Sequence, residues 1–216
     1  MSAPFGVRNI PIPVGGEAPN RPATWQDATT RYDMVGAALG YVADQAELDA
    51  ITDPVVGMLV YRWDDEITYR YNGSAWKAWE SGWIAIAAPT VTNFNIGTLG
   101  NASSTHFYRY QNGRVTQRGV MILGTSGQSV PGAVSVGLQV AGAALPAGAT
   151  AIPVSGNVYA IDTGAALYVG SALRTTSVVQ FWAQNSGQLT SQYATAVPFA
   201  FGAGDMAGYE ITYDPA

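Results

Sequence analysis

Cysteine is absent from the sequence, and histidine and lysine occur once each, as His106 and Lys77. The lack of cysteine excludes disulfide bonds and thiolate metal ligands. Charged residues make up 12% of the chain, about half the share in an ordinary soluble domain. No apolar run approaches the ~20 residues of a membrane-spanning helix, and the net charge of −5 disfavours nucleic acid as a ligand. We therefore expect neither membrane insertion nor nucleic-acid binding.

The few charges are unevenly distributed along the chain. Residues 1–80 hold six basic and eleven acidic side chains, whereas residues 81–216 hold only four of each. A monomeric domain with so few charges has little to keep it in solution, whereas the cores of protein interfaces are depleted of charge. Burial against copies of the same chain is one explanation, and a neutral surface of Ser, Thr, Asn and Gln is the other. We predict self-association of the C-terminal part.

The first 40 residues are expected to form an extended arm. Prolines and a Gly-Gly pair interrupt regular structure over the first 22 residues; they are Pro4, Pro11, Pro13, Pro19, Pro22 and Gly15-Gly16. A short helix is expected near 24–39, with Thr24 as its cap. Arms of this kind become ordered when they dock on a partner, so we interpret residues 1–40 as an attachment segment.

Residues 41–86 are expected to form a small module of one helix and a three-stranded meander. Asp44 is a suitable N-cap for a helix over 44–51, whose first turn is acidic. Three runs typical of strands follow at 58–63, 67–71 and 75–79. Asn72-Gly73, between the last two runs, is a strong indicator of a hairpin.

Residues 90–216 show repeated strand patterns and almost no helical periodicity. Asn112-Gly113 separates runs at 107–111 and 114–123, as a hairpin turn would. Further runs lie at 134–140, 158–161, 167–169, 178–182, 194–201 and 209–213. Strands at this spacing, separated by Gly, Pro and Asn, predict an antiparallel β-sandwich or jelly roll and hence an all-β fold class. The run 178–182 is apolar on both faces, which favours packing between subunits.

Residue types suited to catalysis are scarce. Any Ser-His-Asp arrangement would have to use His106, but no Gly-x-Ser-x-Gly elbow surrounds it, and we interpret it as a surface or hydrogen-bonded loop residue. Asp64-Asp65-Glu66 offers adjacent carboxylates for a divalent cation or a glycosidase, yet acids in a strand turn usually face water. Asp205 is interpreted in the same way. We predict no catalytic residue, no metal site and no cofactor.

The aromatic side chains are the remaining candidates for binding, with six Trp and twelve Tyr in the chain. Aromatic rings stack on the apolar faces of sugars, and amides bond to sugar hydroxyls. Residues 182–188 combine these groups at the junction of a strand and a loop. We predict a glycan site formed by Trp182, Gln184, Asn185, Gln188 and Tyr193. The alternative is that the aromatic rings fill the core or a subunit interface.

Several stretches resemble parts of bacteriophage proteins. Residues 42–51, 57–61 and 69–76 are similar to a small module that recurs in phage tail and fibre proteins. Tyr108–Val115, Leu145–Gly148 and Val197–Asp205 resemble the first hairpin, the mid-domain turn and the closing strand pair in the head domains of phage minor-tail and receptor-binding proteins. The resemblance covers roughly residues 41–80 and 105–216. The chain lacks the repetitive shaft or heptad segment of long fibres, which leaves a short spike, a collar appendage or a head decoration.

Members of this class are commonly homotrimers, with an N-terminal region attached to the virion and a β-rich tip that faces the host. The resemblance therefore implies a structural virion protein, assembled in the host cytoplasm, and not an enzyme. Its implied partners are two copies of itself, other virion proteins through residues 1–40, and a host-surface glycan. An architectural decoration, head fibre or connector is the first alternative. A tail-associated glycan depolymerase is the second, and it would use Asp64, Asp65, Glu66 or Asp205.

A secreted carbohydrate-binding module is a third alternative. Residues Met1 to Val14 show no charged region followed by an apolar core, which is the pattern of a signal peptide. We therefore favour the virion protein over a secreted module.

Overall fold

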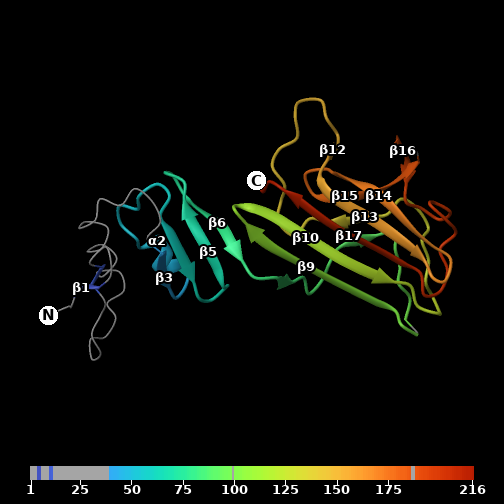
Figure 1. The fold of residues 1–216 in the computed structure, drawn as a ribbon, viewed down its shortest axis with the longest axis horizontal. Helices are drawn as coiled ribbons and strands as arrows, with labels where there is room; N and C mark the ends of the chain where they lie inside the picture. The colour runs from blue at the N-terminus through green and yellow to red at the C-terminus, as the bar shows by residue number, and fades with distance from the viewer. Residues whose placement is uncertain (1–3, 6–9, 12–38, 99, 186–187) are drawn as a thin grey trace. The chain divides into compact units, whose positions relative to one another are not determined.

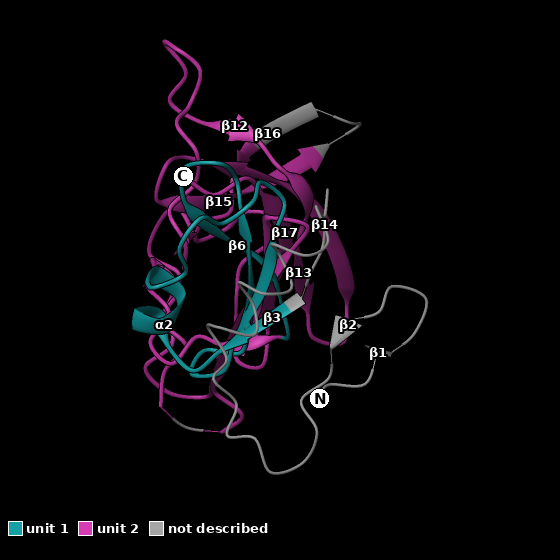
Figure 2. Ribbon diagram, turned by 90° about the vertical axis from the view of Figure 1, so that its left-hand side faces the viewer, with its two compact units in different colours: residues 1–82 teal, residues 83–216 magenta. Residues whose placement is uncertain are grey.

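The computed structural model describes residues 4–5, 10–11, 39–98, 100–185 and 188–216 (Figure 1). The chain divides into two compact units, residues 1–82 and 83–216 (Figure 2). The division falls before the predicted module end at residue 86, because β7 (Ile84–Ala85) pairs with β9 (Ser103–Gln111) of the second unit. Most of the predicted arm, with the helix expected over 24–39, lies outside the described residues. Within the arm, β1 (Pro4–Phe5) and β2 (Ile10–Pro11) pair antiparallel.

The first unit contains a four-stranded sheet and one short helix. Its elements are β3 (Leu39–Val42), α2 (Gln45–Asp49), β4 (Leu59–Arg62), β5 (Ile67–Tyr71) and β6 (Trp76–Ser81). The predicted meander is confirmed as β4, β5 and β6, which pair antiparallel in sequence order. The sequence did not reveal β3, which adds to β4 in parallel. The module therefore has a mixed sheet.

The helix α2 begins as its sequence predicts. The Oδ1 atom of Asp44 accepts a hydrogen bond from the backbone N–H of Glu47 at 3.0 Å. This bond satisfies one of the donors that a helix leaves unpaired at its start. The helix is too short to stand alone, and it is held by Leu48, which is fully buried against Val42, Met58 and Val60.

The second unit is built on one continuous hydrogen-bonded sheet (Figure 1). In addition to β7 and β9, its strands are β8 (Val91–Thr92), β10 (Arg114–Ile122), β11 (Ser135–Gly137), β12 (Ile152–Pro153), β13 (Ser155–Asp162), β14 (Ala166–Arg174), β15 (Val178–Asn185), β16 (Gln188–Gln192) and β17 (Met206–Tyr213). The strand order is β7-β9-β10-β17-β13-β14-β15-β11-β8, with β12 paired to β14 and β16 paired to β15. The β9–β10 hairpin is green in Figure 1 and lies beside β17, which is red. The all-β class is confirmed.

Alternation along the strands gives this sheet a buried face and an outer face. On β17, the buried side chains are Ala207, Tyr209, Ile211 and Tyr213. The sheet curls, so that Phe94, Val134 and Val136 from its far end join the same core. The jelly-roll connectivity expected from the sequence stays a prediction.

One predicted strand of this unit is wrong. Residues 194–201 form turns and bends, in which the backbone N–H groups of Ala194 and Val197 each donate to the other residue's carbonyl at 3.1 Å. Pro198 follows directly and has no N–H to offer a sheet ladder. The stretch Val197–Asp205, which resembles a closing strand pair, therefore forms no strand pair here. The single strand β17 begins directly after Asp205.

Candidate functional site

The predicted glycan residues Trp182 and Gln184 lie on the outer face of β15. The Trp182 side chain is half-buried, and its Nε1 donates a hydrogen bond to Gln180 Oε1 at 3.3 Å. The Gln184 side chain is exposed, and its Nε2 donates to Ser171 Oγ at 2.5 Å. The structure thus brings these two residues onto one surface, where the indole N–H of Trp182 and the amide of Gln184 are already engaged with neighbours.

The other predicted glycan residues do not complete this surface. Asn185 and Gln188 face each other across the β15–β16 turn, but their side chains lie outside the described residues. Tyr193 is fully buried, with its ring edge-on to Phe181 at 6.0 Å between centroids. A ring with no exposed surface cannot stack on a sugar, so Tyr193 offers nothing to a ligand in this structure.

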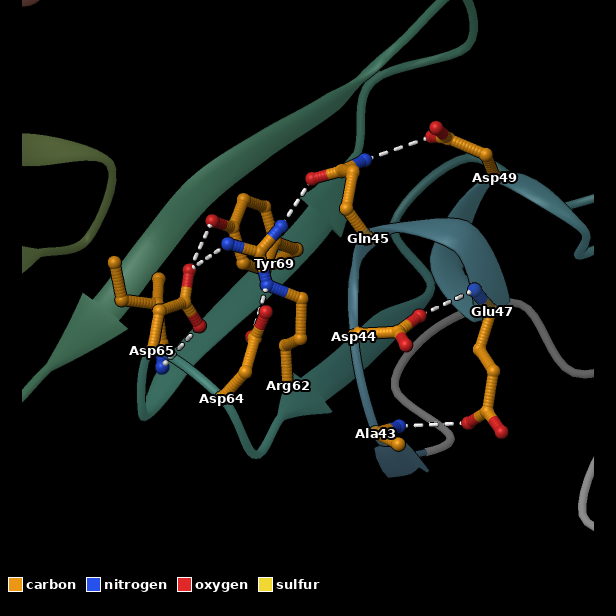
Figure 3. Close-up of polar contacts among 10 residues, drawn as sticks. Ala43, Asp44, Gln45, Glu47, Asp49, Arg62, Asp64, Asp65 and Tyr69 are labelled. Carbon is orange, nitrogen blue, oxygen red and sulfur yellow. Dashed lines mark hydrogen bonds and ion pairs between the residues drawn. The ribbon is translucent and has the colours of Figure 1, made fainter.

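Arg62 holds the acidic turn of the first unit together (Figure 3). Its Nε lies 2.7 Å from Asp64 Oδ1, and its Nη2 forms an ion pair with Asp65 Oδ2. The hydroxyl of Tyr69 donates to the same Asp65 oxygen at 2.6 Å, and the N–H of Ile67 donates to Asp65 Oδ1 at 3.1 Å. These contacts make the turn a structural ion-pair cluster, whereas the sequence indicated acids that simply face water.

Asp205 belongs to the other unit and has a different set of partners. It is 5% exposed, and its two carboxylate oxygens accept the backbone N–H groups of Thr163 at 2.9 Å and Gly202 at 2.6 Å. Within the described part of the chain, no three His, Asp or Glu side chains gather closely enough to hold a metal ion. Of the acids named for the depolymerase alternative, Asp64, Asp65 and Asp205 are therefore engaged in turn structure, and Glu66 is exposed.

Replacing Arg62 by methionine should destabilise the first unit. The change keeps the apolar stem but leaves the half-buried Asp65 without its cation, which should cost about 1–3 kcal/mol of unfolding free energy. Hydrogen exchange of β4 and β5 during urea titration measures the loss. The matched control is Arg70→Met, because Arg70 is exposed and stacks on Trp79 at 4.6 Å. Equal stability of the two variants would contradict the role given to Arg62.

A groove of about 600 Å³ opens in the second unit beside β9. The groove is lined by nine residues, which are Pro89, Val91, Asn93, Phe94, Asn95, Ile96, Ser104 of β9, Ser129 and Pro131. None of these lining residues carries a charge. We call it the Asn93 groove, after the exposed residue whose Nδ2 donates to the carbonyl of Ala133 at 3.0 Å.

A buried polar network lies behind this groove, and Gln117 fixes its orientation. The N–H of Gln139 donates to Gln117 Oε1 at 2.9 Å, so this atom is the acceptor and Nε2 is the donor. Gln117 Nε2 then donates to the carbonyl of Gly137 and to the hydroxyl of Tyr209, both at 2.9 Å. Both protons of the amide are thereby used, and Tyr209 Oη is an acceptor.

We assign the hydroxyl proton of Tyr209 to its hydrogen bond with His106, because Tyr209 Oη already accepts from Gln117. Tyr209 Oη lies 2.9 Å from His106 Nδ1, and His106 Nε2 lies 2.8 Å from Ser104 Oγ. A neutral imidazole that accepts at Nδ1 carries its proton on Nε2. His106 thus donates to Ser104, and the proton of the Ser104 hydroxyl is left to point elsewhere. We call Ser104, His106, Gln117 and Tyr209 the His106 network.

Burial keeps the His106 network neutral. His106 is 2% exposed, and desolvation lowers the pKa of its imidazole. Desolvation also raises the pKa of the Tyr209 phenol, so its hydroxyl keeps its proton. The sequence suggested a loop histidine, whereas the structure places His106 inside β9. Period-two alternation of Ser104, His106, Tyr108 and Tyr110 could have shown that these residues share one face of a strand.

The outer face of the sheet carries two apolar rows that cross four strands. One row, from β10 to β14, consists of Ile122, Met206, Ile161 and Leu167. The other row consists of Val120, Gly208, Tyr159 and Val169. Leu167 is 63% exposed and Val169 is 52% exposed. A Cβ atom on Gly208 would lie 2.3 Å from the ring of Tyr159, so the glycine lets this ring lie flat on the sheet. We call these residues the outer apolar rows.

The first unit presents an exposed aromatic cluster that the sequence did not reveal. Tyr41 and Trp63 stack at 6.1 Å and are 45% and 55% exposed. Tyr61 meets Trp63 edge-on at 5.2 Å. The cluster depends on the parallel pairing of Tyr41 with Tyr61, which brings together residues from strands that the sequence does not show to be neighbours.

The described part of the chain contains no helix with the length and apolarity needed to cross a bilayer. Comparison of the chain with family models, with curated proteins and with solved structures gave no match.

Proposed function

We propose that the chain is a structural protein of a bacteriophage particle, a tail-fibre or minor-tail protein that attaches to the host surface as a homotrimer. The observation that carries this proposal is the pair of outer apolar rows on a unit with eight charged side chains. An apolar patch that contains no charged residue is typical of the core of a protein interface. The resemblance of residues 41–80 and 105–216 to phage proteins is the reason for proposing a threefold assembly and a place in the virion.

The size of the outer apolar rows fits the centre of an interface. Four strands at about 4.8 Å spacing and two residues of each strand on one face cover about 300 Å². A stable interface buries about 800 Å² on each partner, so the rows form the apolar centre. The next row of the same face, Arg118, Glu210 and Asn157, forms a polar rim on one side.

A trimer would serve attachment through avidity. Three copies of one site bind a host surface together, so the overall affinity for a glycan rises although each single contact stays weak. Residues 1–40 anchor the trimer to other virion proteins. No catalysis is required for this role. The architectural alternative shares the trimer and the anchor but lacks the host contact.

Sedimentation of the whole chain tests the proposal. We expect a particle of three chains of 22.7 kDa each, and Leu167→Asp combined with Val169→Asp should reduce it to a single chain, because carboxylates cannot be buried unpaired. The control is Val55→Asp with Val56→Asp, which changes two exposed valines of the first unit. A wild-type protein that sediments as one chain at every concentration would refute the trimer. Adsorption of the trimer to host cells then separates attachment from an architectural role.

A further inference from the structure

The Asn93 groove combines apolar walls with neutral hydrogen-bonding groups. Of its nine lining residues, five are apolar and the other four are asparagine or serine. A charged ligand would find no opposite charge there, and a purely apolar ligand would leave the amides and hydroxyls without partners. The lining therefore matches a ligand that has hydroxyl groups on an apolar frame and carries no charge.

The His106 network makes Ser104 a hydrogen-bond donor to the groove. Ser104 Oγ accepts from His106 Nε2 at 2.8 Å, so its own proton is free to be donated. His106 is 2% exposed and is fixed from behind by the hydroxyl of Tyr209. Because the His106 partner of this hydroxyl is buried and held in place, Ser104 offers its proton to the groove before any ligand arrives.

Asn93 supplies an acceptor in the same groove. Its Nδ2 is used by the carbonyl of Ala133 at 3.0 Å, while its Oδ1 accepts from none of the described residues. The position is well defined, because Asn93 has a left-handed φ of 57°, which asparagine tolerates better than most residues. A sugar hydroxyl both donates and accepts, so it can accept from Ser104 or donate to Asn93 in this groove.

The walls of the groove are held rigidly around these two groups. The backbones of Asn95 and Ser129 exchange hydrogen bonds of 2.8 and 2.9 Å. Asn95 also donates from Nδ2 to the carbonyl of Gly127 at 2.9 Å and accepts the N–H of Gly97 at 3.1 Å. Its side chain is therefore committed to the loop, which leaves Ser104, Asn93 and the hydroxyl of Ser129 for recognition.

From this arrangement we infer that the Asn93 groove binds the ring of a neutral sugar, with Ser104 as donor, Asn93 as acceptor and Val91, Ile96 and Pro131 as the apolar wall. This inference rests on the proposed attachment function and gives it a location. The location differs from the surface predicted at Trp182 and Gln184. An acidic sugar is excluded as the ligand because the groove offers it no cation.

Binding of the whole chain to immobilised oligosaccharides tests the inference. The probes are neutral oligomers of glucose, galactose, mannose and N-acetylglucosamine, with sialylated and uronic acid oligomers beside them. Ser104→Phe should block the groove and weaken binding by roughly 100-fold or more, whereas Ser104→Ala should weaken it about 3- to 10-fold through one lost hydrogen bond. The controls are Ser103→Phe and Ser103→Ala, since Ser103 faces the other side of β9, opposite Ile122.

The outcomes separate the groove from the proposed function. Neutral probes that bind the wild type and the Ser103 variants, but not Ser104→Phe, support the inference. Binding that survives Ser104→Phe but is lost in Trp182→Ala or Trp63→Ala overturns the groove and leaves attachment standing. Binding confined to acidic probes, or to none, also overturns it. Host-cell adsorption by the wild type then decides attachment separately.

Discussion

Replacing Gly119 by alanine is expected to lower the free energy of unfolding of the second unit by about 3–5 kcal/mol. Gly119 lies on β10 directly opposite His106, and a Cβ atom there would lie 2.3 Å from His106 Nδ1. The imidazole cannot move aside without breaking its bonds to Tyr209 and Ser104. The cost therefore adds overpacking of a filled core to the loss of buried hydrogen bonds. Such a loss is a large part of the stability of one domain.

Guanidinium unfolding at fixed protein concentration, followed by hydrogen exchange in β9, β10 and β17, measures this loss. Gly202→Ala is the control in the same unit, because a Cβ atom there meets its nearest neighbour, Asp205, at an ordinary 3.6 Å. The cost of Gly119→Ala should shrink in a His106→Ala background, where the added methyl group has room. If the two substitutions have additive effects, the proposed clash between Gly119 and His106 is wrong.

The two Asn-Gly pairs show how far local sequence specifies this fold. Asn112 and Gly113 have φ angles of 53° and 75° and join Gln111 to Arg114, as the two-residue hairpin predicted for this dipeptide requires. Asn72-Gly73 also makes the predicted hairpin, but by a longer loop in which Asn72 Oδ1 accepts the N–H groups of Ser74 and Ala75. The dipeptide thus predicts the reversal of the chain but not the type of turn.

Long-range pairing is the part that the sequence could not show. The short strand β3 joins β4 in parallel across the intervening helix α2, and no local pattern marks it. The run 134–140 was predicted to be extended, yet only Ser135–Gly137 forms a strand, which pairs with β15. At 194–201 an apolar run with strand-like composition becomes a set of turns. Whether a segment forms a strand depends on its pairing partner, which the local sequence does not identify.

The same limit applies to the candidate site. The sequence offered Trp182 and Tyr193 by composition alone, and the structure puts one on the outer face and the other in the core. His106, Gln117 and Tyr209 come from three different strands, so their network exists only once β9, β10 and β17 are paired. The alternation around His106 was visible in the sequence, but its partners were not.

Acidification below pH 6.5 is expected to destabilise the second unit through His106. Burial lowers the pKa of this imidazole below its ordinary value of 6.5, so the unfolded chain binds a proton at a higher pH than the folded chain. Stability is therefore complete above pH 6.5 and falls as the pH drops toward the folded-state pKa. The slope cannot exceed the one-proton limit of about 1.4 kcal/mol per pH unit.

The composition of the chain makes this effect attributable to a single group. His106 is the only histidine, and Asp and Glu side chains ordinarily titrate near 4. A loss of stability between pH 6.5 and 5 is therefore attributed to His106. Urea unfolding at half-unit pH steps measures it, with His106→Gln as the control that cannot titrate. The variant should be less stable at pH 7 but nearly flat across the window. A wild-type profile as flat as that of the variant would mean that the imidazole is charged equally in both states, and the proton order derived for Tyr209, His106 and Ser104 would then fail.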